Sequence, residues 1–141
     1  MNKNELIDKV EIQVRFSEVD SLSVVWHGNY VKYMEDGRES FGNKYNLHYL
    51  DFIKNKVVAP IVYIDLEYKK FLKYGEKVII ETKYVDSDAS KLKFEYIMYR
   101  SSDSEIVATG KSMQVFLNTD GELILTIPEF LNEWKKKWGL I

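Results

Sequence analysis

Hydrophobic and polar residues alternate along this chain with two different periods, and each period predicts a type of secondary structure. Between residues 10 and 15 apolar side chains occupy every second position, which is typical of a strand with one buried face. Over residues 29–45 the spacing changes to three and four residues, the period of one face of an α-helix. That face carries Tyr30, Met34, Gly37, Phe41 and Tyr45. A helix of this length reaches about 25 Å, so it can cross a whole sheet.

The chain after residue 60 is predominantly β-forming. Apolar and polar residues alternate over 62–69. β-Branched and aromatic residues dominate three further segments, which are 76–86, 91–100 and 105–117. The connecting segments SDAS and SSDS are short and polar, as antiparallel hairpins require, and the Asp120-Gly121 pair predicts one more tight turn.

The C-terminal segment has a helical pattern again. Pro128 is well placed to open a short helix, because proline is favoured at a first helical position. Phe130, Trp134 and Trp138 then share one face of that helix. The whole order of elements predicts the α+β class, with a single antiparallel sheet of five to six strands wrapped around one long helix and a short C-terminal helix.

Two regions of the predicted sheet carry more apolar residues than one buried face needs. Residues 78–80 and 96–99 are consecutive apolar residues, so both faces of the sheet receive apolar side chains. One long helix covers only one face. We therefore expect a homo-oligomer, a dimer or a tetramer, in which a second copy of the chain covers part of the other face or an open sheet edge.

Composition narrows the range of partners and compartments. The 141 residues fit one domain, residues 1–141, and a formal net charge of −2 gives no basis for binding nucleic acid or an anionic membrane. The longest apolar run, residues 57–64, is too short to span a bilayer, and the charged N-terminal segment lacks the apolar stretch of a signal peptide. We therefore expect a cytoplasmic protein. Because the chain has no cysteine and only two histidines without ligand spacing, we expect no bound metal. We also expect no cofactor.

Residues 14–45 contain a long motif with tight spacing. It runs from an arginine and an aromatic residue through an aspartate to a Val-Val-Trp-His-Gly-Asn-Tyr segment, and it ends on the predicted helix. The residues that carry it are Arg15, Phe16, Asp20, Val24, Val25, Trp26, His27, Gly28, Asn29, Tyr30, Glu35 and Arg38. In these residues the chain resembles the 4-hydroxybenzoyl-CoA thioesterase-like acyl-CoA thioesterases, a resemblance that implies the hotdog fold. The rest of the chain resembles that family in strand order and length only.

The chain departs from the family pattern at two positions. Ser23 stands where the family usually has glycine, and Gly37 replaces an alanine of the helix. If residue 23 has a positive φ, serine is strained there, because only glycine adopts that conformation freely. Gly37 predicts instead that the helix lies close against the sheet, since no side chain stands between them.

The motif fits the chemistry of thioester hydrolysis, which needs a nucleophile or base and donors for a tetrahedral oxyanion. Asp20 provides a carboxylate, and the start of the helix presents the backbone N–H groups of residues 27–29. Gly28 allows a ligand to approach that helix end closely. The resemblance implies the same roles: Asp20 attacks or activates water, and the backbone amides of His27, Gly28 and Asn29 polarise the carbonyl.

Other polar residues of the motif have less specific interpretations. The His27 side chain either packs against its neighbours or takes part in the chemistry. Tyr30 lies on the buried face of the helix, so it is expected to support the site from the core. Glu35 is expected to support the site by pairing with Arg38 one turn later or with a partner group. Asp36 is expected to be a solvated helical acid.

Three lysines are candidates for contacting the phosphates of coenzyme A, namely Lys69, Lys70 and Lys91. Surface lysines are also common at strand ends, where they only keep an edge soluble. The expected substrate is an acyl-CoA or acyl-carrier-protein thioester with an aliphatic or aromatic acyl group. Coenzyme A would then be part of the substrate and not a cofactor.

Two other functions stay open at this point. A hotdog 3-hydroxyacyl-thioester dehydratase would use His27 together with Glu35 or Asp36, and it would leave Asp20 without a catalytic role. A non-catalytic acyl-thioester binding module would keep the pocket without turnover, and Ser23 is the feature that favours it.

Overall fold

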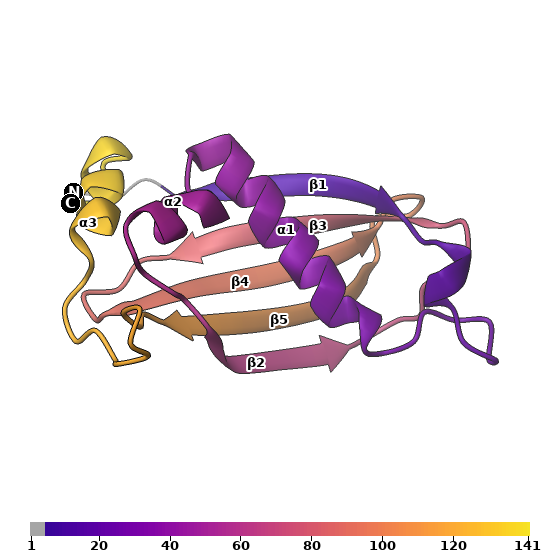
Figure 1. Cartoon of the computed structure of the whole chain (residues 1–141). Helices are drawn as coiled ribbons and strands as arrows, with labels where there is room; N and C mark the ends of the chain where they lie inside the picture. Colours follow the sequence, from indigo (N-terminus) through magenta and orange to yellow (C-terminus); the bar gives the residue numbers. More distant parts are fainter. Residues whose placement is uncertain (1–4) are drawn as a thin grey trace.

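A five-stranded antiparallel sheet carries one long helix on one face in the computed structural model of the protein, which describes residues 5–141 (Figure 1). The strands lie in the order β1-β3-β4-β5-β2, and all neighbours are antiparallel, so the predicted α+β architecture is confirmed with five strands. Within these residues no helix is both long and apolar enough to cross a membrane. The strands are β1 (Ile7–Gln13), β2 (Ile61–Tyr68), β3 (Lys77–Val85), β4 (Lys91–Arg100) and β5 (Ile106–Val115).

The long helix α1 (Asn29–Tyr45) has the predicted bounds, and all five residues of its predicted apolar stripe are buried. Gly37 lies against β3, as expected. A Cβ atom added to Gly37 would lie 2.8 Å from Ile80 Cγ2 and closer still to Thr82 Oγ1. No side chain tolerates such contacts, so glycine at this position is what allows α1 to approach the sheet closely.

The sheet face under α1 is buried, whereas the outer face mixes apolar and charged residues. Along β3 and β4 every second residue is buried. On the outer face Ile79 and Tyr99 are half-buried, as the consecutive apolar residues predicted. The same face carries charges that alternate across the strands, because Glu95 lies between Lys83 and Lys111. The outer face alone therefore gives only a weak reason for assembly.

β2 is an edge strand with an unpaired side. It pairs with β5, and no other strand among residues 5–141 pairs with it. Val62 and Tyr63 on β2 are about half exposed. An unpaired edge of this kind can bind a strand of another chain.

The C-terminal helix α3 (Glu129–Lys137) closes the C-terminal end of α1. The indole N–H groups of Trp134 and Trp138 both donate to the backbone carbonyl of Tyr45, at 2.7 and 2.9 Å. They satisfy a carbonyl that the last turn of a helix otherwise leaves unpaired. The Trp134 ring also contacts the rings of Phe41 and Tyr84. The predicted C-terminal helix is confirmed.

Three local features differ from the sequence-based expectations. β1 begins three residues before the predicted strand of residues 10–15 and ends at Gln13, and the single-turn helix η1 (Phe16–Glu18) follows it with an exposed Phe16. Residues 49–54 form the short helix α2 (Tyr49–Lys54), for which no element was predicted because its six residues show no clear period. The segment 122–127 forms only an isolated bridge at Leu123, so no sixth strand forms.

Candidate active site

Asp20 lies in a tight hairpin that precedes α1. Val19 and Val25 form an isolated antiparallel bridge, and the Asp20 N–H donates to the Val24 carbonyl at 2.9 Å. The Asp20 side chain belongs to the turn, since its Oδ1 atom accepts the Leu22 N–H at 2.8 Å. Its Oδ2 atom has no donor within hydrogen-bond distance in the part of the chain that the structure describes. One carboxylate oxygen is thus held in place, and the other is open to water or a substrate.

Ser23 completes the hairpin in a left-handed backbone conformation, with a φ of +66°. Its N–H donates to the Asp20 carbonyl at 3.0 Å and closes a β-turn. A non-glycine residue in this conformation costs about 1–2 kcal/mol. The strain expected from serine at this position is therefore present, and the contacts around the hairpin offset it.

Gly28 begins α1 in an ordinary helical conformation, with φ −66° and ψ −22°. Glycine is therefore not needed here for backbone freedom. It is needed because the Trp26 indole lies over it: a Cβ atom at position 28 would lie 2.7 Å from ring atom Cε3 and closer to two others. The half-exposed Trp26 ring therefore covers the Cβ side of Gly28 within one chain, whereas the expected approach of a ligand to the Gly28 N–H stays a prediction.

Two backbone N–H groups, and not three, are available at the head of α1. The Asn29 N–H donates to the Trp26 carbonyl at 2.9 Å, so it drops out of the expected oxyanion site. The N–H groups of His27 and Gly28 have no acceptor among residues 5–141. They lie at the positive end of the helix, where they can donate to a developing oxyanion.

The side chains of His27 and Asn29 lie in different environments. His27 is exposed and its ring lies against Trp26, with ring centroids 4.9 Å apart. Its carbonyl accepts the Tyr68 hydroxyl at 3.0 Å, which ties the head of α1 to the end of β2. Asn29 is buried, and its Nδ2 atom donates to the Glu18 carbonyl at 2.9 Å. The Asn29 side chain therefore fixes the start of α1 and does not face a substrate.

Glu18 is a candidate residue that sequence reasoning missed. Its buried carboxylate accepts hydrogen bonds from the backbone and the guanidinium of Arg15 and from the Tyr33 hydroxyl. Burial acts to raise the pKa of this carboxyl, but the hydrogen bonds and the Arg15 charge outweigh it, so the pKa of Glu18 lies below its ordinary value. The only sequence signal is its position, three residues after Arg15 and two before Asp20.

The polar residues on α1 fulfil the expectations in part. Tyr30 is buried, and this burial raises its pKa to about 12, so it is a neutral packing residue as predicted. Glu35 and Asp36 are both exposed. The expected ion pair between Glu35 and Arg38 does not form, since no contact within 4 Å joins them in the described chain. Arg38 donates to the Tyr96 hydroxyl instead, at 3.5 Å.

The three candidate phosphate-binding lysines are not brought together. Lys69 and Lys70 follow the end of β2, where Tyr68 contacts His27. Lys91 begins β4 at the opposite end of the sheet, the end at which β2 begins. One phosphate site within a single chain therefore cannot contain all three, and only Lys69 and Lys70 lie near the head of α1.

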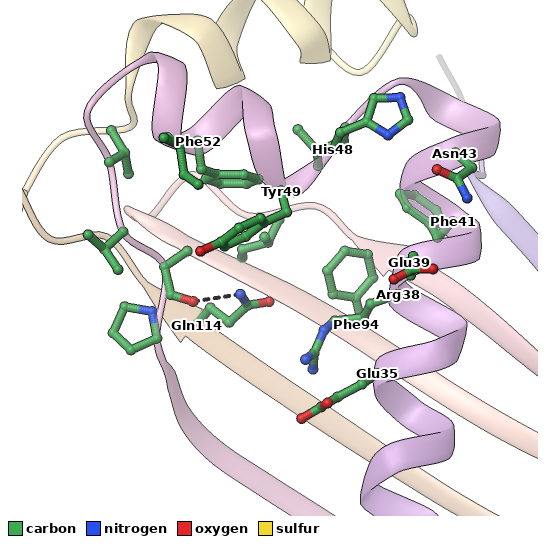
Figure 2. A pocket seen from close by; sticks show the side chains of 17 residues that line it. Glu35, Arg38, Glu39, Phe41, Asn43, His48, Tyr49, Phe52, Phe94 and Gln114 are labelled. Atoms are coloured by element: carbon green, nitrogen blue, oxygen red, sulfur yellow. Dashed lines mark hydrogen bonds between the residues drawn. The ribbon is translucent and has the colours of Figure 1, made fainter.

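A cavity of about 510 Å³ lies beside the C-terminal half of α1 (Figure 2). It is bounded by α1, by α2, by the segment 57–60 that leads into β2, and by β4 and β5. This volume is within the usual range for small-molecule pockets. The walls are mainly apolar and aromatic, and they include Phe41, Phe52, Leu92 and Phe94.

Polar and charged side chains also line this cavity, namely Glu35, Arg38, Glu39, Asn43, His48, Tyr49 and Gln114. Gln114 donates from Nε2 to the Ala59 carbonyl at 2.7 Å, and its buried Oε1 atom has no hydrogen-bond partner among the described residues. Figure 2 shows Glu35 and Arg38 on the α1 side of the cavity. Asp20 is not among the lining residues. Within one chain the predicted catalytic carboxylate and the cavity therefore belong to opposite ends of α1.

The family of the chain follows from two comparisons. The sequence pattern of the Thioesterase-like superfamily matches residues 14–135. A Bacillus subtilis (strain 168) relative named "Putative acyl-CoA thioesterase YneP" is 34% identical over 110 residues, which cover 77% of this chain and 80% of that protein. The chain belongs to the Thioesterase-like superfamily, and it is a thioester hydrolase.

Solved structures confirm the hotdog fold. The DHNA-CoA thioesterase from Staphylococcus aureus superposes with a TM-score of 0.84 at 25% identity, over 93% of this chain and 89% of that one. A mutant 4-hydroxybenzoyl-CoA thioesterase complexed with 4-hydroxybenzoyl-CoA superposes with a TM-score of 0.78 at 19% identity, over 92% of this chain and 98% of that one. The expected architecture of one sheet wrapped on one long helix is therefore shared with known thioesterases.

Proposed function

We propose that this thioester hydrolase cleaves acyl-CoA substrates with Asp20 as nucleophile or general base. The observation that carries the proposal is one short segment that holds an unpaired Asp20 Oδ2 atom and the unpaired N–H groups of His27 and Gly28. Asp20 either attacks the thioester carbonyl carbon or takes a proton from an attacking water. The two N–H groups stabilise the oxyanion. The C–S bond then breaks, and coenzyme A leaves as a thiolate that takes up a proton. In the general-base route this step leaves the free acid. In the nucleophilic route it leaves an anhydride between the acyl group and Asp20, which a water molecule hydrolyses to the free acid and the regenerated carboxylate.

The cavity supports an apolar acyl group, aromatic or aliphatic. Its walls include the rings of Phe41, Phe52 and Phe94, and stacking and burial against such rings favour flat or flexible hydrocarbon groups. The names of the structural relatives support the aromatic class, since one of them specifies 4-hydroxybenzoyl-CoA. Lys69 and Lys70, near the head of α1, are the candidates for contacting the coenzyme A phosphates.

The proposal includes a homodimer formed through β2. If two copies pair their β2 strands antiparallel, the end of one β2 lies beside the beginning of the other. The end of β2 lies at the head of α1, since Tyr68 contacts His27. The beginning of β2 follows the segment 57–60, which lines the cavity. Pairing would therefore bring the cavity of one chain to the Asp20 hairpin of its partner.

Exposed apolar residues at the two ends of β2 support this arrangement. In a single chain water covers them, whereas antiparallel pairing would place the two sets against each other and bury both. Every one of these side chains is at least half exposed. The set near the beginning of β2 is Tyr49, Leu50, Ile53 and Val58, and the set near its end is Leu22, Trp26, Tyr68 and Phe71.

The test is a panel of aromatic and aliphatic acyl-CoAs with a thiol reagent that reports released coenzyme A. We expect turnover of at least one apolar acyl-CoA, and we expect sedimentation at micromolar concentration to show a dimer or an assembly of dimers. Enoyl absorbance from a 3-hydroxyacyl-CoA without thiol release would favour the dehydratase instead. Tight binding of every acyl-CoA without release would favour the binding module, and a fully active monomer would contradict the dimer.

A further inference from the structure

Glu18 connects three segments that meet at the proposed site. Its Oε1 atom accepts the Arg15 N–H at 2.8 Å and the Tyr33 hydroxyl at 3.1 Å, and its Oε2 atom accepts Arg15 Nη2 at 2.9 Å. Its backbone carbonyl accepts the Trp26 N–H and Asn29 Nδ2, each at 2.9 Å. One residue therefore joins the end of β1, the hairpin and the first turns of α1.

These contacts enclose the hairpin that carries Asp20. Glu18 precedes Asp20 by two residues, and Trp26 directly precedes the His27 and Gly28 N–H groups. The bond from the Trp26 N–H to the Glu18 carbonyl joins the two sides of the hairpin. The relative position of the carboxylate and the two N–H donors is therefore set largely through Glu18.

The Glu18 network is more suited to fixing geometry than to adding stability. Glu18 is only 4% exposed, and a buried ion pair often adds no net stability over apolar residues of the same size. Charge-assisted hydrogen bonds are short and directional, so they hold their partners in defined places. Ser23 in the same loop keeps a strained conformation, which persists only where the surroundings impose it.

We propose that Glu18 is a positioning residue, which holds the Asp20 carboxylate at a fixed place relative to the N–H groups of His27 and Gly28. This inference rests on the proposed function, and Glu18 itself does not touch the substrate. A displacement of about 1 Å at a reacting centre can cost about 10²-fold in rate. Loss of the Glu18 contacts therefore lowers kcat more than it changes KM.

Two substitutions test this role. Glu18→Gln keeps the size of the side chain but removes its charge and one of its two acceptor oxygens. The remaining oxygen cannot accept from the Arg15 N–H and Tyr33 on one side and from the Arg15 guanidinium on the other. We expect kcat to fall about 10- to 100-fold, with KM within about threefold of wild type. Hydrogen exchange at the Ser23 and Trp26 amides should accelerate. Tyr33→Phe removes one hydrogen bond and should lower kcat about 3- to 10-fold.

Asp86→Asn is the matched control. Asp86 is also a largely buried carboxylate that is paired with a cation and a tyrosine hydroxyl, since Lys135 Nζ lies at 2.8 Å and the Tyr84 hydroxyl at 3.3 Å. It lies beside α3, at the other end of α1 from the hairpin. Asp86→Asn should lower Tm, while kcat and the exchange of the hairpin amides stay at wild-type values.

Three results would overturn the positioning role: a wild-type kcat in Glu18→Gln, unchanged exchange at the Ser23 and Trp26 amides, or an equal loss of kcat in Asp86→Asn. If Glu18→Gln does not fold, Tyr33→Phe decides through the same two readouts. Failure of the proposed function is distinguishable, because wild type would then release no thiol or Asp20→Asn would keep its turnover. In that case the exchange data still show whether Glu18 holds the hairpin.

Discussion

The two ends of α1 are stabilised in opposite ways. At the C-terminal end, the Tyr45 carbonyl accepts two indole N–H groups, and aromatic rings pack around it. At the N-terminal end, a buried carboxylate and its hydrogen bonds hold a strained hairpin. At the C-terminal end the Tyr45 carbonyl and the two indole N–H groups are therefore paired with one another within the fold. The N-terminal end leaves one carboxylate oxygen and two N–H groups without partners among residues 5–141.

The C-terminal end of α1 therefore contributes mainly to the stability of the fold, and the N-terminal end provides groups for the reaction. Satisfied carbonyls and packed rings lower the free energy of the folded state, but they offer nothing to a substrate. Unpaired donors and acceptors at the surface are available to stabilise a transition state. Substitutions at the N-terminal end should therefore affect kcat, and substitutions at the C-terminal end should affect Tm.

The largest expected effect is that of Asp20→Asn. The amide keeps the size of the side chain and can still accept the Leu22 N–H, but it can neither attack nor take a proton. We expect kcat to fall at least about 10²-fold, with Tm and KM nearly unchanged. Steady-state thiol release and thermal unfolding measure both quantities. A variant that keeps most of its turnover would remove Asp20 from the mechanism.

Trp134→Ala should show the opposite behaviour. Trp134 is buried, and truncating a buried tryptophan costs about 3–5 kcal/mol. In a chain of this size that loss lowers Tm by about 10 °C or more, while kcat below the transition should change little. Trp26→Ala is the control at the other end, because Trp26 is half exposed and its loss should leave Tm nearly unchanged. Equal effects on Tm would refute the division between the two ends.

The acid stability of the hairpin should depend on Glu18. Because its pKa is lowered in the folded state, the ionised carboxylate contributes stability above its unfolded pKa, about 4.3, and this contribution is lost as pH falls through the folded value. The wild-type free energy of unfolding should therefore decline more steeply below about pH 4 than that of Glu18→Gln. Urea unfolding between pH 3 and pH 7 measures this difference, and parallel pH profiles would contradict it.

The smallest expected effect is that of Ser23→Gly. Glycine relieves a left-handed penalty of about 1–2 kcal/mol but makes the unfolded chain more flexible, so a net gain of about 0.5–1 kcal/mol should remain. Ser21→Gly in the same loop is the control. Ser21 is not a positive-φ residue, so this substitution should lower the free energy of unfolding slightly. Urea unfolding of the two variants measures both changes, and equal shifts would show that residue 23 is not strained.

The sequence predicted elements wherever one period continued over many residues. The bounds of α1 and the close approach at Gly37 were readable because the apolar stripe runs through the whole helix. The strands β3 to β5 were readable because β-branched and aromatic residues dominate them and short polar segments separate them. The helix α2 has too few residues to show a period, and its single buried residue, Phe52, meets rings from distant segments.

The candidate site was predictable only as far as local sequence reaches. Asp20 and the head of α1 lie within one short motif, so their proximity could be expected. The role of Glu18 depends on Tyr33, which is fifteen residues away and meets it only in the folded chain. The Asn29 N–H and the space above Gly28 are taken by contacts with Trp26, which no spacing rule reveals. The cavity is assembled from five separate parts of the fold.

The most direct test of the central claim is subunit complementation. Asp20→Asn removes the carboxylate, and Val58→Trp is designed to block the cavity at a half-exposed lining residue. Each variant alone should be nearly inactive. In a co-expressed mixture about half of the dimers contain one copy of each variant. If the Asp20 of one chain serves the cavity of its partner, each of these mixed dimers has one intact site of two. The mixture then recovers about a quarter of wild-type turnover. Co-expressed variants that form mixed dimers and recover no activity would show instead that each site belongs to a single chain.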